Sequence, residues 1–217
     1  MKLFADTGNL KELEPLASLG ILDGVTTNPS LMAKESGDPR QILKQICQLV
    51  QGPVSAEVVA TDAAGMIREG RELASIDEHI VVKVPFTKDG VKACKTLASE
   101  GKRVNVTLIF SPTQAWLAAK VGAAYVSPFV GRLDDVGTTG MNLVREIVDI
   151  FDNFEYSTEV LVASVRNPTH VIDAGRMGAD VVTCPAAVIE QLFKHPLTDI
   201  GLRKFLEDWE KAQAVKA

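Results

Sequence analysis

Several common sequence features are missing from this chain of 217 residues. Its three cysteines lie far apart and form no C-x-x-C pair, which argues against a disulfide framework and against a zinc knuckle. No apolar run approaches the ~18 residues of a membrane span, and residues 1–20 lack the basic-then-apolar pattern of a signal peptide. We therefore expect a cytoplasmic protein with reduced cysteines and no membrane partner. The cysteines are Cys47, Cys94 and Cys184.

Nucleotide and metal motifs are also missing. The sequence has no G-x-G-x-x-G, no G-K-[ST] and no H-E-x-x-H, which removes the usual dinucleotide, P-loop and zinc-protease interpretations. His79, His170 and His195 are isolated, without metal-ligand spacing, and we expect them at the surface or at helix ends. The 23 basic and 28 acidic residues are interspersed and give a net charge of −5, so no patch for nucleic acid is expected.

What the chain does contain is a repeated alternation of short β-branched runs with amphipathic segments. Apolar spacing predicts helices such as 41–50 and 141–150 between these runs. Such alternation indicates a parallel sheet, and eight units of about 27 residues fit an α/β protein with a (β/α)8 TIM barrel as a single domain, 1–217. The predicted strands are Lys2–Asp6, Gly24–Asn28, Val54–Val59, Ile80–Val84, Arg103–Ile109, Ala123–Ser127, Glu159–Ser164 and Asp180–Thr183.

Six of the ten prolines stand just after a predicted strand and before a helical pattern. Proline suits the first turn of a helix because its φ is already helical and that turn needs no N–H partner. The residue before proline is pushed to extended geometry, which suits the end of a strand. These junctions indicate the carboxyl edge of the sheet, which carries the chemistry in such a barrel. The six are Pro29, Pro85, Pro112, Pro128, Pro168 and Pro185.

Polar residues interrupt the predicted strands near their carboxyl ends. Strands covered on both faces usually read as nearly continuous Val, Ile and Leu. Counting by twos places the polar residues of each strand on one face. If that face points inward, they meet in one layer near the mouth of the barrel. The layer contains Asp6, Asn28, Glu57, Lys83, Asn105, Thr107, Ser127 and Ser164.

Lys83 is the most informative member of this layer, because it lies within the run Ile-Val-Val-Lys-Val-Pro. Burial disfavours the charged ammonium and leaves a neutral amine, which can attack a carbonyl and form a Schiff base. The alternative is a structural lysine paired with Glu57 or Asp6. Those carboxylates offer the proton transfers that Schiff-base chemistry needs, or serve only in a salt bridge or a helix cap.

Two further features lie outside the strands. Arg132 and Arg166 follow the sixth and seventh predicted strands, where barrels often bind phosphate; the alternative is ordinary solvated surface charge. After the eighth unit, residues 198–217 are expected to form an extra C-terminal helix with an apolar stripe that docks on this barrel or on a neighbouring subunit. The stripe consists of Leu202, Phe205, Leu206 and Trp209.

Seven segments together suggest a family. They are FADTGN (4–9), DGVTTNPSL (23–31), AEV (56–58), VVKVP (81–85), NVTLIF (105–110), YVSPFVGR (125–132) and ASVRN (163–167). These segments resemble the transaldolase family, in order along nearly the whole chain, and most of all its short-chain branch, which also contains fructose-6-phosphate aldolase. The resemblance implies sugar-phosphate substrates and a reaction without metal or other cofactor.

The resemblance also implies a role for each matching residue. Lys83 matches the lysine that forms the Schiff base with a ketose donor, and Asp6 matches the acid/base that acts on the hydroxyl next to the cleaved bond. Glu57 and Thr107 match the pair that positions a catalytic water. The residues that match the dihydroxyacetone-binding group are Asn28, Asn105 and Ser127, and those that match the phosphate-binding group are Arg132, Ser164 and Arg166.

Three positions separate transferases from aldolases within this family. Glu57, Ser127 and the substrate-site residue Phe129 follow the transferase pattern, whereas the aldolase branch carries glutamine, alanine and tyrosine. The resemblance therefore implies a transaldolase of the pentose phosphate pathway, which moves a dihydroxyacetone unit from sedoheptulose 7-phosphate or fructose 6-phosphate to an aldose phosphate. The alternatives are a fructose-6-phosphate aldolase, a metal-dependent aldolase and a non-catalytic sugar-phosphate-binding barrel. Short family members form pentamers or decamers, so a homo-oligomer is expected.

Overall fold

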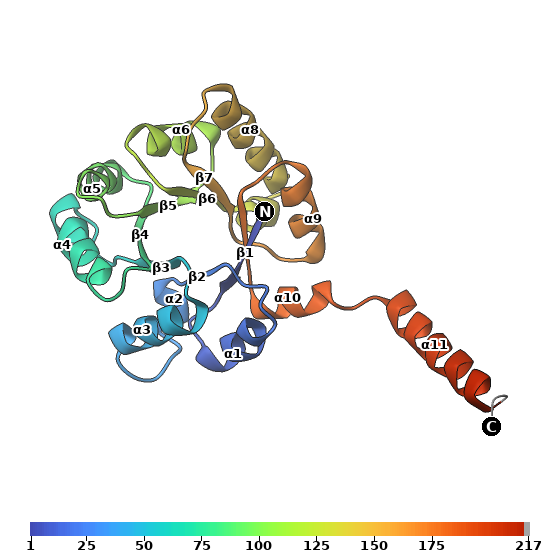
Figure 1. Cartoon of the computed structure of the whole chain (residues 1–217). Helices are drawn as coiled ribbons and strands as arrows, with labels where there is room; N and C mark the ends of the chain where they lie inside the picture. Colours follow the sequence, from blue (N-terminus) through green and yellow to red (C-terminus); the bar gives the residue numbers. More distant parts are fainter. Residues whose placement is uncertain (215–217) are drawn as a thin grey trace.

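The chain folds into a closed barrel of eight parallel strands. The computed structural model describes residues 1–214. Neighbouring strands pair in chain order, and β1 closes the barrel on β8 (Figure 1). The predicted (β/α)8 barrel is therefore confirmed. The strands are β1 (Lys2–Asp6), β2 (Gly24–Thr26), β3 (Val54–Glu57), β4 (Ile80–Pro85), β5 (Val104–Ile109), β6 (Tyr125–Pro128), β7 (Glu159–Val162) and β8 (Val181–Cys184).

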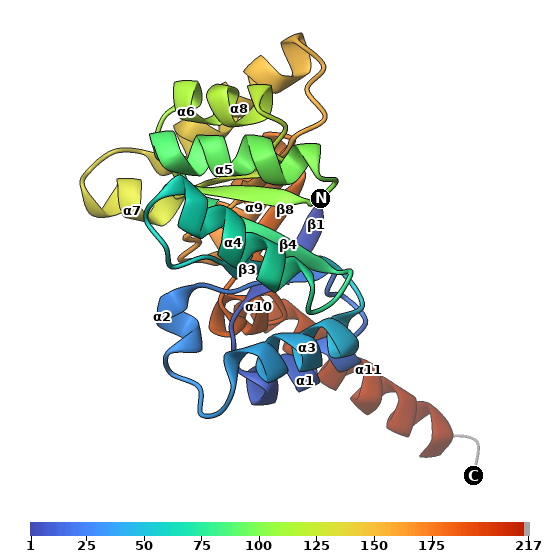
Figure 2. The same cartoon turned by 90° about the vertical axis from the view of Figure 1, so that its left-hand side faces the viewer.

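Helices surround the barrel, and two short ones, α2 and α7, follow β2 and β6 beyond the strand ends (Figure 2). Within residues 1–214, no helix combines the length and the hydropathy that a membrane span requires. The helices are α1 (Leu10–Ser18), α2 (Pro29–Met32), α3 (Pro39–Val50), α4 (Ala63–Ala74), α5 (Lys88–Ser99), α6 (Pro112–Lys120), α7 (Val130–Asp135), α8 (Gly140–Asn153), α9 (Pro168–Arg176), α10 (Ala186–Leu192) and α11 (Pro196–Ala214).

Some strands end earlier than the sequence predicts. β2 ends at Thr26 rather than Asn28, and β7 ends at Val162 rather than Ser164. The residues beyond these ends have left the sheet: Asn28 caps α2, and Ser164 has a left-handed φ of 59°. Part of the polar layer is therefore carried by strand-to-helix junctions rather than by the strands.

The proline junctions lie at the carboxyl edge, as predicted. Three prolines stand in the first turn of α2, α6 and α9, each behind a side chain that caps the helix. Pro85 and Pro128 instead end β4 and β6, and Pro185 immediately precedes α10. The capping side chains are Asn28, Ser111 and Asn167.

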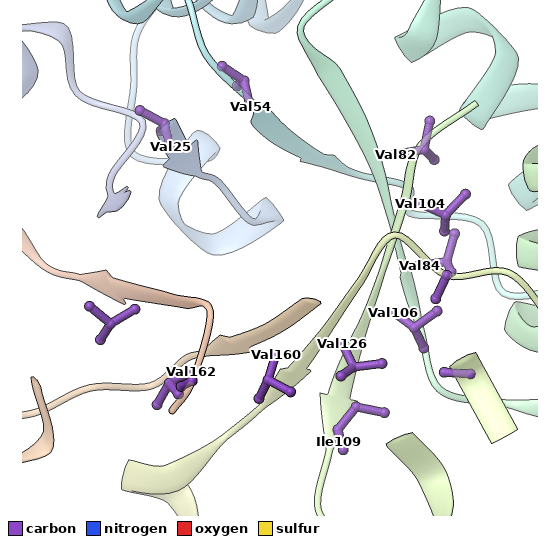
Figure 3. Packing of buried hydrophobic residues seen from close by; sticks show 14 of the residues in the cluster. Val25, Val54, Val82, Val84, Val104, Val106, Ile109, Val126, Val160 and Val162 are labelled. Atoms are coloured by element: carbon purple, nitrogen blue, oxygen red, sulfur yellow. The ribbon is translucent and has the colours of Figure 1, made fainter. Parts of the chain in front are cut away.

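In β1, β4, β6, β7 and β8, alternate residues pack into two separate clusters. One face packs against the helices, as Val82 and Val84 of β4 do in Figure 3. Val81, on the opposite face, belongs to a second buried cluster inside the barrel, so Lys83 also faces the interior. Gly24 leaves room for this cluster, because a Cβ there would lie 2.7 Å from the ring of Phe4. The interior cluster consists of Phe4, Val81, Tyr125, Leu161, Ala163 and Val181.

Helix α11 projects away from the barrel (Figure 1). Within Pro196–Ala214 no residue is buried, and Phe205 and Trp209 are 73% and 65% exposed. The predicted C-terminal segment thus forms a helix that does not cover its own barrel. Residues 215–217 of that segment lie outside the described residues. Docking of the helix on a neighbouring subunit stays a prediction.

Candidate active site

Lys83 lies at the centre of the polar layer, on β4. Its Nζ is 2.9 Å from Oε2 of Glu57 and donates a hydrogen bond to the carbonyl of Thr27 at 3.0 Å. The parallel register of β3 and β4 places Glu57 directly beside Lys83. The lysine is 4% exposed. It is therefore buried, and its carboxylate partner is Glu57, which puts a proton acceptor within hydrogen-bonding distance of the amine.

Asp6 lies at the end of β1. The hydroxyl of Thr26 donates to its Oδ1 at 2.8 Å, and the hydroxyls of Thr26 and Thr183 are 2.6 Å apart. Because Thr26 gives its hydrogen to Asp6, Thr183 is the donor in the second bond. Burial raises the pKa of Asp6, against the opposing effects of the Thr26 hydrogen bond and the charge of Lys83. A raised pKa suits a group that both accepts and returns a proton.

A chain of hydrogen bonds fixes the amide of Asn105 beside Lys83. Ser127 donates to Oδ1 of Asn105 at 2.8 Å, and Nδ2 of Asn105 donates to the hydroxyl of Ser55 at 3.1 Å. All three side chains are buried. The bonds determine which way the amide points, and they position the Ser127 hydroxyl at the wall of the cavity that contains Lys83.

Thr107 is the buried polar side chain without a partner. Its Oγ1 makes no hydrogen bond within residues 1–214. With Glu57 and Lys83 it lines a cleft of about 350 Å³. Buried polar groups in native proteins are nearly always hydrogen-bonded, so an unpaired hydroxyl facing a cleft points to a ligand or a water as its partner. The geometry thus allows Thr107 and Glu57 to hold one small polar molecule next to the amine.

A second cavity, of about 250 Å³, adjoins this cleft. It is lined by Asp6, by Lys83 and by the residues predicted to bind phosphate. Arg132 stacks on Phe129, with 5.1 Å between the guanidinium carbon and the ring centroid. Arg166 forms an ion pair of 2.8 Å with Asp135. Two guanidinium groups in one cavity suit a phosphate dianion.

The structure thus brings the predicted residues together. Ten of the eleven line the two cavities, and Asn105 lies behind Ser127. Their roles stay predictions. The sequence assigned no role to three hydroxyls that support the site, although each stands on an inward strand face. They are Thr26, Ser55 and Thr183.

His170 was expected at the surface or at a helix end. It lies in the first turn of α9, but it is buried, at 8% exposed. No apolar pattern around it indicates burial, because the elements that cover it are distant in the sequence. Its ring contacts Asp134 in α7, which is 36 residues away along the chain.

A profile described as "Transaldolase/Fructose-6-phosphate aldolase" matches residues 3–216. The chain belongs to this family. Three relatives named "Probable transaldolase" illustrate the similarity. The protein of Petrotoga mobilis is 57% identical over 98% of this chain and 96% of its own length. The protein of Syntrophobacter fumaroxidans is 59% identical over 98% of this chain and 98% of its own length. The protein of Aquifex aeolicus is 59% identical over 97% of this chain and 97% of its own length.

Membership in the transaldolase/fructose-6-phosphate aldolase family agrees with the site geometry. The matched range includes all eight strands, apart from Lys2 at the start of β1, and every residue of the two cavities. The family name covers both a transferase and an aldolase.

Proposed function

We propose that this chain is a class I transaldolase that acts through a Schiff base on Lys83. The observation that carries the proposal is the buried Lys83 amine, 2.9 Å from Glu57 and in one cavity with Asp6. The donor is sedoheptulose 7-phosphate or fructose 6-phosphate, and the acceptor is an aldose phosphate of the pentose phosphate pathway. Relatives over nearly the full chain length carry the name "Probable transaldolase".

The reaction begins with the amine. Glu57 accepts a proton from the Lys83 ammonium, and the free amine adds to C2 of the ketose to give a carbinolamine. The carbinolamine oxygen takes up the proton that Glu57 accepted and leaves as water, which produces the protonated Schiff base. Thr107 and Glu57 hold that water, because the unpaired Thr107 hydroxyl faces the same cleft as Glu57 and Lys83.

Carbon–carbon cleavage then depends on Asp6. Its carboxylate removes the proton of the C4 hydroxyl, the C3–C4 bond breaks, and the electron pair moves to the Schiff base as an enamine while an aldehyde leaves. The acceptor aldehyde follows the reverse course: C3 of the enamine attacks it, and Asp6 returns the proton to the new hydroxyl. Asn28, Asn105 and Ser127 hold the three-carbon unit meanwhile.

Phosphate recognition falls to Arg132, Ser164 and Arg166. They line the cavity that Lys83 and Asp6 also line, so one substrate can contact the phosphate-binding residues and the reactive amine at the same time. Glu57, Ser127 and Phe129 favour transfer over simple aldol cleavage, because a carboxylate shuttles protons and a phenylalanine offers the enamine no proton.

Borohydride trapping tests the proposal. Treatment with fructose 6-phosphate and borohydride should leave a reduced three-carbon adduct on the peptide that contains Lys83. Lys83→Ala should lose both the adduct and turnover, whereas Lys88→Ala, at the exposed start of α5, should keep both. A label on another peptide, or an active Lys83→Ala variant, would refute the assignment. Binding without any adduct would indicate the non-catalytic barrel.

Acceptor dependence separates the transferase from the aldolase. With fructose 6-phosphate alone, a transaldolase releases little product, and it turns over when erythrose 4-phosphate is added. An aldolase releases dihydroxyacetone without an acceptor. Equal rates with and without erythrose 4-phosphate would therefore favour the aldolase activity.

The same proposal extends to assembly and location. The exposed apolar stripe of α11 docks on a neighbouring copy of the chain, and the copies form a cytoplasmic pentamer or decamer. The exposure of Phe205 and Trp209 supports this, because large apolar side chains gathered on one free helix usually mark a contact surface.

A further inference from the structure

His170 is a buried histidine whose two ring nitrogens are both engaged. Nε2 is 2.9 Å from Oδ2 of Asp134, and Nδ1 accepts the backbone N–H of Arg166 at 3.2 Å. Because Nδ1 acts as an acceptor, the ring proton resides on Nε2 and is donated to Asp134. One imidazole therefore links α9, which carries it, to α7 and to the loop after β7.

These two partners belong to the segments that carry the predicted phosphate ligands. Asp134 lies two residues after Arg132 in α7, and its Oδ1 also accepts the N–H of Gly140 at the start of α8, at 2.8 Å. Arg166 is itself the other arginine. The imidazole thus contacts the backbone of Arg166 directly and holds α7, which carries Arg132, through the side chain of Asp134.

Arg166 needs such support because its own side-chain ion pair is weak. The ion pair between Arg166 and Asp135 is solvent-exposed on both sides, and exposed pairs stabilise a geometry by only about 0–1 kcal/mol. Ser164, between β7 and Arg166, has a left-handed φ of 59°, a conformation that non-glycine residues hold only where the surroundings enforce it. The hydrogen bond from Arg166 N–H to His170 is one such constraint.

We propose that His170 is a positioning residue for the phosphate of the substrate. It touches neither the ketone nor the cleaved bond; it aligns Arg132 and Arg166 through Asp134 and through the Arg166 backbone. The inference rests on the proposed function, because it assumes that these arginines bind phosphate. It requires that His170 affects the binding of phosphorylated sugars and leaves the chemistry at Lys83 unchanged.

The test compares one donor with and without its phosphate. We would measure kcat and KM for fructose 6-phosphate and for fructose, with glyceraldehyde as an unphosphorylated acceptor, and competition by inorganic phosphate. His170→Phe should raise KM for fructose 6-phosphate about tenfold, because small displacements of positioning groups are costly. It should weaken inhibition by phosphate equally and leave kcat and the fructose reaction unchanged. His170→Asn, whose Oδ1 can accept from Arg166, should recover part of the loss.

Matched variants make the outcome decisive. Arg166→Ala should show the same selectivity for the phosphorylated donor, and Asp173→Asn, on α9 and paired with Arg176, should change nothing. Where His170→Phe does not fold, His170→Asn and Asp134→Asn give the test, each with a smaller rise in KM.

Two results would overturn the role of His170 alone, and two others would overturn the proposed function as well. Equal losses with fructose and fructose 6-phosphate, or an unchanged KM in a His170 variant while Arg166→Ala raises it, would make His170 purely structural. A wild-type protein that shows no adduct on Lys83, or no preference for the phosphorylated donor, would instead refute the proposed function and the inference with it.

Discussion

Asp6 illustrates how a single environment sets the character of a residue. Burial raises its pKa, and the hydroxyl of Thr26 and the charge of Lys83 only partly oppose that effect. Thr183 donates to Thr26 and so keeps the Thr26 hydroxyl directed at the carboxylate. The burial that suits Asp6 to proton transfer therefore also means that its ionised form destabilises the folded protein.

Asp6→Asn should lower turnover about 100-fold or more, the usual contribution of a general acid–base group, and raise the thermal stability at neutral pH. The folded-state pKa lies above the ordinary value of 3.8, so the folded wild type binds the proton more tightly than the unfolded chain. Its stability therefore falls as pH rises from that value through the raised one. The Asp6→Asn variant does not lose stability in this way, because asparagine does not ionise.

Thermal melts from pH 3.5 to pH 8 check this prediction. The difference in Tm between Asp6→Asn and the wild type should grow with pH through that window and then level off. A constant difference at every pH would show that the carboxylate has no burial cost. Thr26→Val should shift the acidic limb of the wild-type activity profile to higher pH, because it removes the bond that favours the ionised Asp6.

We predict that the choice between transfer and release depends on Phe129. Its ring lies between Arg132 and Phe110, and it lines both cavities. Phe129→Tyr should increase the release of free dihydroxyacetone severalfold relative to transfer, because a phenol near the enamine can protonate it. Phe110→Tyr, on the adjacent, partly exposed ring, is the control. An unchanged ratio of release to transfer in Phe129→Tyr would count against this explanation.

At the scale of elements, the junctions after the strands both end the sheet and place the site. Asn28 accepts the N–H of Leu31 to cap α2 and also lines both cavities, so one side chain starts a helix and contacts the substrate site. Helix α7 approaches the loop after β7 closely, and the N–H of Gly131 donates to the carbonyl of Ser164 at 3.1 Å. Such an approach requires a residue without a Cβ.

Gly131→Ala should therefore disturb the predicted phosphate-binding residues more than the residues around Lys83. A Cβ at this position would collide with the Ser164 carbonyl and with the Arg166 side chain, so α7 must shift. We expect a loss of about 1–3 kcal/mol in the free energy of unfolding, as for other overpacked sites, and a larger rise in KM for fructose 6-phosphate than for fructose. Gly201→Ala, in open space on α11, should be neutral or stabilising. A Gly131→Ala variant with wild-type stability would mean that the junction tolerates the shift.

The whole molecule is a complete barrel with one helix left uncovered. The eight strands close without a free edge, and strand ends and strand-to-helix junctions line the two cavities. Helix α11 contributes no residue to either cavity. Assembly through α11 should therefore affect the state of association and stability more than the chemistry.

Replacing Leu202 and Phe205 by glutamate should dissociate the assembly, because the charges would have to be buried in the contact. Light scattering after size-exclusion chromatography measures the mass, and turnover per chain should stay within about twofold of the wild type at 25 °C, since the site is intact. Lys204→Ala, between the two positions, should keep the assembly. A wild-type chain that is monomeric would disprove the predicted docking of α11.

Local pattern alone was sufficient to predict the barrel and the inward polar face of its strands. Proline after a strand restricts backbone geometry over two residues, and the two-residue period of a strand is strictly local, so Lys83 could be placed on the inner face with Val81. Contacts between distant segments could not be predicted in this way. Whether Lys83 pairs with Glu57 or Asp6 depends on the register between strands, which only the closed barrel establishes.

The burial of His170 and the hydroxyl pair of Thr26 and Thr183 depend on tertiary contacts as well. His170 of α9 meets Asp134 of α7, and Thr26 of β2 meets Thr183 of β8; no helical or strand period relates either pair. Identity and spacing of residues thus sufficed for the chemistry that the inner face offers. The partners that tune and position that chemistry are chosen by packing, since burial and hydrogen bonding are properties of the folded neighbourhood rather than of the local sequence.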